Sequence, residues 1–366
     1  MKTFRIVMIT FFSVLALCLC ALLWRWLSVG SAGNFMTSVE VDDCYSLVQE
    51  KEFTAEDIAT LSVKYPSSAD VLIYESADNT VTVKEYMNFT PTDNQLSKIE
   101  LHGSTLVIEG KKRNFVSSFT FTGPHSYTEI YLPHDLVASL LVETVSGDVR
   151  SELSLVNYSE FTISTTSGDI IFPTVEAKKI SVSSTSGEIR LESAAGKSVM
   201  LSTTSGDIAL EQLAGDSSVS STSGEIRIGN ADENIEVSTV SGDIRLDNLN
   251  APFRFSTTSG EITVNNGTGC GKAGTVSGDI RISLSEPNGD LTISTTSGEV
   301  NLSLPETASF TLDFNSTSGS CNTFFDDVLS FNKKGNEAKG QYGENTGNKL
   351  DVSTVSGDLR ITKFAQ

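Results

Sequence analysis

The decapeptide VSTVSGDIRL, residues 237–246, is one copy of a motif that fills most of this 366-residue chain. Counted from its glycine, Gly242, apolar residues stand at positions −5, +2 and +4, and a hydroxyl residue stands at −3. Positions −4, −1, +1 and +3 are polar. Alternation with a period of two on both sides of a glycine is typical of strand, turn and strand. The motif therefore predicts two β-strands that meet at a glycine corner.

This corner recurs about every 19 residues along the chain. Its glycines are Gly147, Gly168, Gly187, Gly206, Gly224, Gly242, Gly260, Gly278, Gly298, Gly319 and Gly357. The last interval, from Gly319 to Gly357, is about two repeats long, so we expect one coil there to have lost the motif. A fixed period of this length is typical of repeat architectures.

A second corner follows half a repeat later, for example at Ala195-Gly196-Lys197. Antiparallel hairpins packed as a sandwich give no reason to repeat the same corner chemistry at a constant interval. Stacked coils do give a reason, because each residue then lies about 4.8 Å from its counterpart in the next coil. A leucine-rich repeat would need a leucine pattern and an asparagine ladder, which are absent from the sequence. The repeat therefore predicts an all-β, single-stranded parallel β-helix, or β-solenoid.

Stacking also predicts what each column of equivalent residues does. We expect the corner glycine to supply a positive φ, with the preceding serine as a local hydroxyl cap. The Ser/Thr column at −3 faces inward on alternation, so its hydroxyls are expected to bond to the corner backbone or to one another.

Acidic residues occupy position +1 in nearly every copy. This outer acidic ladder consists of Asp148, Asp169, Glu188, Asp207, Glu225, Asp243, Glu261, Asp279, Glu299 and Asp358. Arginine often stands two residues later, on the same outer face, where it offsets the repulsion between carboxylates. Calcium solenoids use Gly-Gly-x-Gly-x-Asp nonapeptides, which this spacing does not match. We therefore expect a salt-bridged edge rather than a metal site.

The N-terminal segment predicts an uncleaved membrane anchor. Lys2 and Arg5 precede an uncharged run from Ile6 to Trp24. At 1.5 Å per residue this run reaches roughly 28 Å, close to the ~30 Å of a hydrocarbon core and longer than a signal-peptide core. Basic residues on the short side hold that side in the cytoplasm. We therefore expect a single-pass protein of the cell membrane with its C-terminal part outside the cell.

The remaining chain divides by its pattern. Residues 1–33 are assigned to the cytoplasmic tip, the anchor and its flank, and 34–52 to a spacer. Residues 53–140 contain strand-like runs without the glycine motif, so we interpret them as irregular first coils. Regular coils are expected over 141–366, interrupted by a polar loop at 332–348.

Composition excludes several functions. A net charge of −20 argues against nucleic acid as a partner, because polyanions need a basic face. The three histidines, His102, His125 and His134, have no metal-ligand spacing. We expect no catalytic residue, cofactor or metal, since the architecture already explains the acidic positions. A polysaccharide-acting β-helix enzyme is the weakest alternative.

The phrase EIYLPHDLVASLLVETVSGDV (residues 129–149), the many SGD and SGE coils and the final VSTVSGDLRI resemble the bacterial "putative adhesin" β-helix family of unknown function. The resemblance runs from about Thr54 onward. It implies a right-handed β-helix and a cell-envelope setting, and it supplies no catalytic residues. Two functions remain open: a non-catalytic extracellular binding or adhesion module, and an accessory of envelope-stress sensing that acts through a membrane partner. The sequence names neither the ligand nor the oligomeric state.

Overall fold

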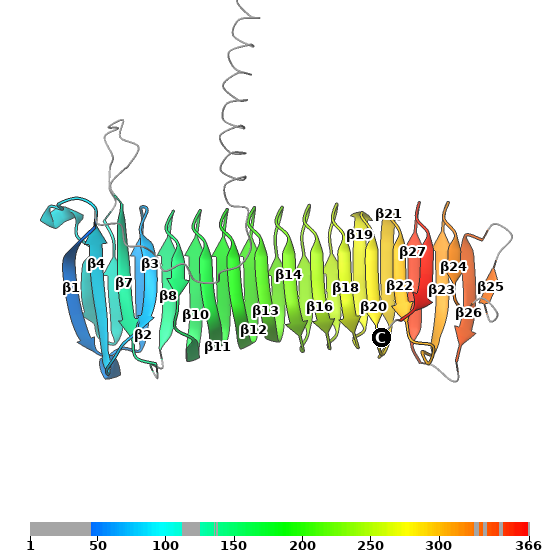
Figure 1. Cartoon of the computed structure of the whole chain (residues 1–366), viewed down its shortest axis with the longest axis horizontal. Helices are drawn as coiled ribbons and strands as arrows, with labels where there is room; N and C mark the ends of the chain where they lie inside the picture. The colour runs from blue at the N-terminus through cyan, green and yellow to red at the C-terminus, as the bar shows by residue number, and fades with distance from the viewer. Residues whose placement is uncertain are drawn as a thin grey trace, which may run out of the picture. The chain divides into compact units, whose positions relative to one another are not determined.

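The computed structural model describes residues 45–364, apart from 112–124, 135, 137, 326–328, 332–334 and 344–346. The expected anchor, and the expected spacer up to residue 44, lie outside the described residues. Within the described part, no helix has the length and apolar character needed to cross a membrane. That part contains 28 β-strands and two three-residue 3₁₀ helices, η1 (Ala55–Asp57) and η2 (Asp93–Gln95). The expected all-β class is therefore confirmed (Figure 1).

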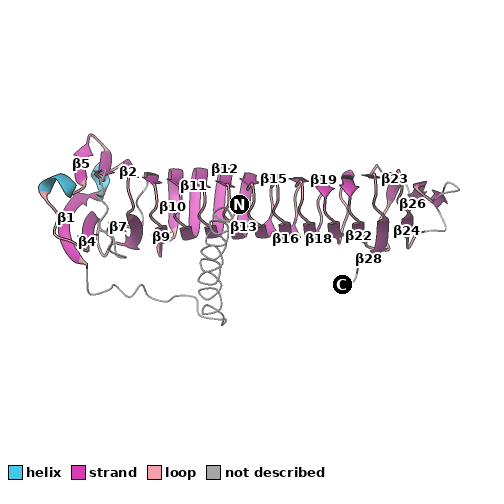
Figure 2. Ribbon diagram, turned by 90° about the horizontal axis from the view of Figure 1, so that it is seen from above, coloured by secondary structure: helices cyan, strands magenta, loops and turns pink. Residues whose placement is uncertain are grey.

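The regular coils form two rows of strands that face each other (Figure 2). Strands before the glycine corner are β8 (Ser139–Thr144), β15 (Ile235–Ser238), β17 (Phe253–Ser256), β19 (Gly271–Ser277) and β21 (Leu291–Ser297). Strands after it are β9 (Val149–Ser151), β14 (Ile226–Ala231), β16 (Ile244–Leu249), β18 (Ile262–Gly267), β20 (Ile280–Leu284) and β22 (Val300–Leu304). Four longer strands, β10 (Leu155–Thr165), β11 (Ile170–Ser184), β12 (Ile189–Thr203) and β13 (Ile208–Ser220), continue through the second corner.

Neighbouring coils pair in parallel, with each residue beside its counterpart. In one row, Ser238 pairs with Ser256, which pairs with Gly274. In the other row, Ile244 pairs with Ile262, which pairs with Ile280. The predicted β-solenoid of stacked coils is therefore confirmed.

Apolar columns fill the space between the two rows. Ile244, Ile262 and Ile280 are fully buried, as are Val237 and Ile293 on the facing strands. Burying one such side chain contributes about 1.5–3 kcal/mol, so each coil adds a similar increment to one continuous core.

At the N-terminal end the order of coils in space differs from their order in the sequence. The first coil consists of β2 (Thr60–Tyr65) and β3 (Asp70–Glu75). It lies between the coil of β8 and β9 and an outer coil of β6 (Thr105–Glu109) and β7 (Ser126–Leu132). Antiparallel strands cover that outer coil: β4 (Thr80–Met87) and then β1 (Ser46–Thr54) on β7, and β5 (Lys98–His102) on β6.

The C-terminal end repeats this arrangement. The last coil, β27 (Lys349–Thr354) and β28 (Leu359–Lys363), lies between the coil of β21 and β22 and an outer coil of β23 (Phe310–Ser316) and β24 (Cys321–Thr323) (Figure 1). Strand β26 (Glu337–Tyr342) pairs antiparallel with β23, and β25 (Leu329–Phe331) pairs with β26.

Three expectations need correction. The spacer cannot extend to residue 52, because β1 begins at Ser46 and pairs with β4. The expected polar loop at 332–348 contains strand β26, whose partner β23 would otherwise present an open edge. In the described part of the long interval before Gly357, the chain forms the covering strands β25 and β26 in place of the expected coil without the motif.

Candidate functional site

The glycine corners form a continuous column along one edge of the solenoid. A Cβ built on Gly224 would lie 1.7 Å from the carbonyl oxygen of Gly206, and one on Gly242 would lie 1.9 Å from that of Gly224. The expectation of a positive φ is wrong: the glycines with positive φ are others, for example Gly215 in the second corner. Glycine is needed at the corner because the backbone of the neighbouring coil occupies the space of a side chain.

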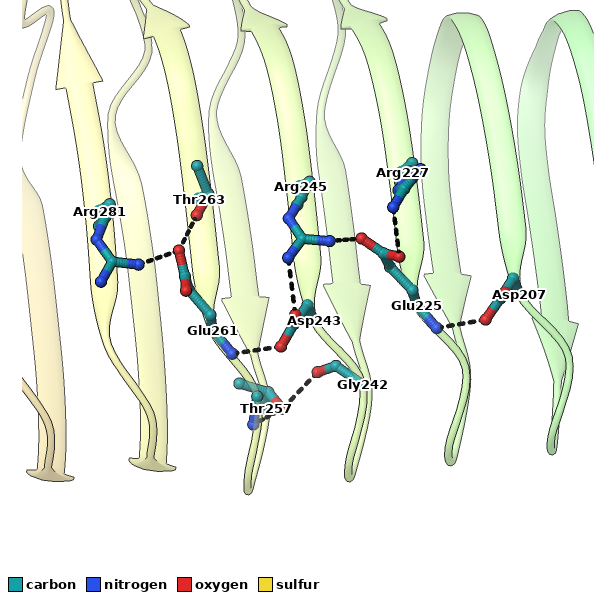
Figure 3. A network of polar contacts seen from close by, with 11 residues as sticks. Asp207, Glu225, Arg227, Gly242, Asp243, Arg245, Thr257, Glu261, Thr263 and Arg281 are labelled. Carbon is teal, nitrogen blue, oxygen red and sulfur yellow. Dashed lines mark hydrogen bonds and ion pairs between the residues drawn. The ribbon is translucent and has the colours of Figure 1, made fainter. Parts of the chain in front are cut away.

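The Ser/Thr column at −3 holds this close approach together. Thr257 accepts a hydrogen bond from the N–H of Gly260 at 3.1 Å. It also donates one to the carbonyl of Gly242 in the neighbouring coil at 3.2 Å (Figure 3). The same pair of bonds occurs at Thr239 and Ser221. The expected role of the inward hydroxyls is confirmed, and they rather than the serine before the glycine cap the corner.

The aspartates of the outer acidic ladder bind backbone of the next coil. Asp243 Oδ1 accepts the N–H of Glu261 at 2.9 Å, and Asp207 Oδ1 accepts that of Glu225 at 2.8 Å (Figure 3). Asp148, Asp169, Asp279 and Asp358 accept equivalent bonds. These carboxylates therefore join coils as an extra rung beyond the strand ladders.

Arginines connect the carboxylates of adjacent coils. Arg281 binds Asp279 of its own coil at 2.8 Å and Glu261 of the preceding coil, and Arg245 bridges Asp243 and Glu225 in the same way. The hydrogen bond from Arg281 lowers the pKa of Glu261 below its usual value. Because these pairs are partly exposed, each contributes at most about 1 kcal/mol.

In the part of the chain that the structure describes, no group of three or more Asp, Glu, His or Cys side chains is arranged to bind a metal ion. The three histidines lie apart, each near one carboxylate: His102 near Glu100, His125 near Asp70 and His134 near Glu75. The repeat columns therefore build the solenoid edge.

The sequence analysis missed one member of the outer acidic ladder, Asp70. Asp70 Oδ1 accepts the N–H of Asp148 at 2.9 Å, and the carbonyl of Ala69 takes the place of a corner glycine carbonyl beside Gly147. The signal was present as Ser68-Ala69-Asp70, which differs from the Ser-Gly-Asp core of the motif only by alanine for glycine. Burial raises the pKa of Asp70.

A second feature that the sequence did not reveal is a group of tyrosines at the N-terminal end, here called the tyrosine face. It consists of Tyr45, Tyr74, Tyr86, Tyr127 and Tyr131. Tyr74 on β3 pairs in register with Tyr131 on β7, and Tyr127 on β7 pairs with Tyr86 on β4. The rings of Tyr86 and Tyr127 stack at 4.6 Å between centroids, and those of Tyr74 and Tyr131 lie 5.5 Å apart.

Charged groups lie between the two ring pairs. Glu129 on β7 accepts a hydrogen bond from the Tyr131 hydroxyl at 3.0 Å and pairs in register with Lys84 on β4. The Lys84 ammonium lies 5.0 Å from the Tyr131 ring centroid and 3.4 Å from Glu50 of β1. Burial, reinforced by Glu129, raises the pKa of Tyr86 to about 12.

The signal for this face was the period-two spacing of Tyr127, Glu129 and Tyr131, which places them on one side of a strand. What the spacing could not give was the register of β7 against β3 and β4. Five of the eight tyrosines in the chain gather here, from three strands and the residue before β1.

Comparison with known proteins identifies a family. A family model described as Toastrack DUF4097 matches residues 58–256 and 233–362. No curated protein matches the chain.

Several solved structures are similar at low identity. A "putative cell adhesion protein" from Clostridium sporogenes is 12% identical over 86% of this chain and 99% of its own, with a TM-score of 0.20. A "putative adhesin" from Bacteroides fragilis is 18% identical over 62% of this chain and 97% of its own, with a TM-score of 0.38. Another, from Parabacteroides merdae, is 11% identical over 88% and 98%, with a TM-score of 0.23.

Proposed function

The chain belongs to the Toastrack DUF4097 family, and from that premise we propose that it is a non-catalytic, adhesin-like binding module, held at the outer side of the cell membrane by its N-terminal helix. It binds a sugar polymer of the cell envelope through the tyrosine face. The observation that carries this proposal is the gathering of five tyrosines, all half-buried except the buried Tyr127, around Glu129 and Lys84 on one sheet surface.

The chemistry of the tyrosine face suits a sugar. Tyrosine offers an apolar ring and a hydroxyl in one rigid side chain, and sugars present C–H groups beside hydroxyls. Tyr127 and Tyr131 are four residues apart on β7, so they lie about 13 Å apart along the strand. A polymer crossing the face would meet the half-buried rings of Tyr74 and Tyr131 at one end and that of Tyr86 at the other, with Glu129 and Lys84 between them. The acidic chain disfavours a polyanionic polymer, so a neutral one fits best.

The regular coils support a binding role rather than catalysis. Their inward hydroxyls and outer carboxylates are engaged in bonds between coils, as described for Thr257 and Asp243. These groups serve the scaffold, and the tyrosine face stands apart from that pattern. The membrane position rests on the apolar run from Ile6 to Trp24.

The test of binding is an affinity measurement with isolated envelope polysaccharide. The double variant Tyr74→Ala/Tyr131→Ala is expected to bind at least tenfold more weakly than the wild type, whereas Tyr131→Phe, which keeps the ring, should retain most of the affinity. Phe324→Ala is the matched control, because it removes an exposed ring from the opposite end of the solenoid. Melting temperatures of all variants show whether the fold is kept.

Equal affinity of the wild type and the double variant would contradict the proposal for the tyrosine face. Failure of the wild type to bind any envelope polymer, together with crosslinking to a membrane protein in cells, would favour the envelope-stress accessory instead. For the anchor, N-terminal sequencing of the membrane-extracted protein should find Met1 or Lys2. A start near Gly33 would show cleavage and refute the anchor.

A further inference from the structure

The last coil, β27 and β28, fills a slot between two coils that precede it in the sequence. Leu350 pairs with Leu291 of β21 on one side and with Leu312 of β23 on the other. Leu359 pairs with Val300 of β22 and with Cys321 of β24. The chain therefore builds both walls of the slot before it builds the coil that occupies it.

The sequence of this coil matches the interior of the solenoid. Residues 352–361, VSTVSGDLRI, differ from residues 237–246 only by the exchange of Ile and Leu at two positions. The outer coil departs from the motif, with Ser320 in place of an acid and Asn322 in place of arginine. A coil with the full motif can form the corner contacts with a neighbouring coil on each side. An end coil has a neighbour on one side only, so it does not need the full motif.

The contacts in the slot repeat those of the regular stack. A Cβ on Gly357 would lie 1.9 Å from the carbonyl oxygen of Gly298, and one on Gly319 would lie 1.9 Å from that of Gly357. Asp358 Oδ1 accepts the N–H of Ser320 at 2.7 Å, and its carbonyl accepts the N–H of Val300 at 2.9 Å. The slot therefore recognises a coil by its glycine, its aspartate and its apolar column.

These contacts do not depend on which molecule supplies the coil. We propose that the slot also accepts residues 349–363 of a second copy of this chain, so that copies join by exchanging their last coil. Exchange keeps the strand pairings of β27 and β28 and the glycine contacts of the corner, and changes only which molecule supplies the coil. This inference rests on the topology of the C-terminal end and is independent of the proposed sugar binding.

Protein concentration decides whether a chain seats its own last coil or exchanges it with another copy. A short connection presents the coil to its own slot at an effective concentration on the order of millimolar, so dilute chains close on themselves. Exchange is therefore expected during folding at high local concentration.

The first test supplies the coil as a separate peptide. In the full chain with Gly357→Val, purified in detergent, the valine side chain would overlap the Gly298 carbonyl, so the coil cannot seat. We expect a lower melting temperature than in the wild type, recovered in a saturable manner by a synthetic peptide of residues 348–366. The control is the same peptide with Gly357→Val, which should bind at least tenfold more weakly.

Two results would overturn the peptide prediction: no binding of the wild-type peptide to the variant chain, or equal binding of both peptides. If the variant chain does not fold alone, it is refolded with each peptide. Soluble, folded complex with the wild-type peptide only supports the slot, and aggregation with both refutes it.

The second test concerns copies of the chain. Wild-type chain refolded from urea at rising concentration should give a rising fraction of dimer by light scattering, whereas Gly357→Val should give no such dimer. Monomer at every concentration, or the same dimer fraction in both chains, would overturn exchange between copies.

Discussion

The middle of the solenoid and its two ends differ in the order in which their coils are stacked. From β10 to β20, each coil lies beside the coils that precede and follow it in the sequence. At each end, one further coil lies between the middle and the outermost coil. This coil consists of β2 and β3 at one end and of β27 and β28 at the other. The middle is therefore held by local, repeated contacts, and the ends by pairings between segments far apart in the sequence.

The ends differ from the middle because an end coil has no neighbour on one side. An uncovered coil would expose the apolar column and a row of unpaired backbone groups. Antiparallel strands, β4 and β5 at one end and β26 at the other, cover these edges. A solenoid without such covers would join other copies edge to edge.

The largest effect is expected from removal of the last coil. Truncation after Asn348 deletes Leu350, Val352, Leu359 and Ile361, which are all buried. At about 1.5–3 kcal/mol for each side chain, the C-terminal end loses roughly 6 kcal/mol or more. Hydrogen exchange should accelerate in β21 to β26 while β11 to β13 stay protected. Uniform acceleration along the chain would show that the ends and the middle unfold as one unit.

Substitution of a corner glycine tests the middle. Gly224→Ala places a Cβ within 1.7 Å of the Gly206 carbonyl oxygen, so the two coils must separate locally. We expect a loss of about 3 kcal/mol in the free energy of unfolding, measured by urea denaturation. Gly347→Ala is the matched control, because no atom lies within 4 Å of its added Cβ. Gly335 is unsuitable as a control, since its φ of +73° strains any side chain. Equal midpoints would contradict the stacked register.

A substitution in the Ser/Thr column at −3 is expected to lower stability by a smaller amount. Thr257→Val keeps the volume but removes both bonds to the corner, which leaves the buried Gly260 N–H unsatisfied. The expected cost is about 1–3 kcal/mol. Thr258→Val is the control, because Thr258 is exposed and valine already stands at the equivalent position, Val240, in the neighbouring coil. The same loss in both variants would show that the bonds of Thr257 do not matter.

Alkaline pH should loosen the N-terminal end before the middle. The pKa of Tyr86 is raised in the folded chain to about 12, above the 10.0 of an unperturbed tyrosine. The neutral side chain therefore stabilises the fold fully below pH 10, and this stabilisation is lost as the pH rises through about 12. Hydrogen exchange at β4 and β7 should rise in this range. Tyr86→Phe should flatten the dependence, and an unchanged dependence would assign the effect to other groups.

The smallest effect concerns the arginines of the ladder. Arg281→Gln should cost less than about 1 kcal/mol and should cost less still at high salt. Because the hydrogen bond from Arg281 lowers the pKa of Glu261, that pKa should rise in the variant, as NMR titration can measure. Arg254→Gln, on an exposed strand face 4.0 Å from Glu236, is the control and should leave Glu261 unchanged. A large loss of stability would mean that the ladder carries more of the fold than its exposure implies.

The sequence by itself determined the coil. Its period, its apolar alternation and its glycine, hydroxyl and acidic columns were enough to predict stacked strands with an inward hydroxyl and an outer salt-bridged edge. They were enough because each residue lies next to the equivalent residue of the next coil. The contacts of one repeat therefore describe those of every regular coil. The hidden rung at Asp70 obeys the same rule and was readable as Ser68-Ala69-Asp70.

Only the tertiary structure decided why the corner requires glycine, where the end coils lie, and which residues gather on the tyrosine face. The reason for glycine is a carbonyl one coil away, as at Gly224, and not a local backbone angle. The positions of β2 and β27, and the register that brings Tyr74 beside Tyr131, depend on pairings between distant segments. Alternation along a strand fixes which face a residue occupies but not which strand lies next to it, so these features leave no periodic trace in the sequence.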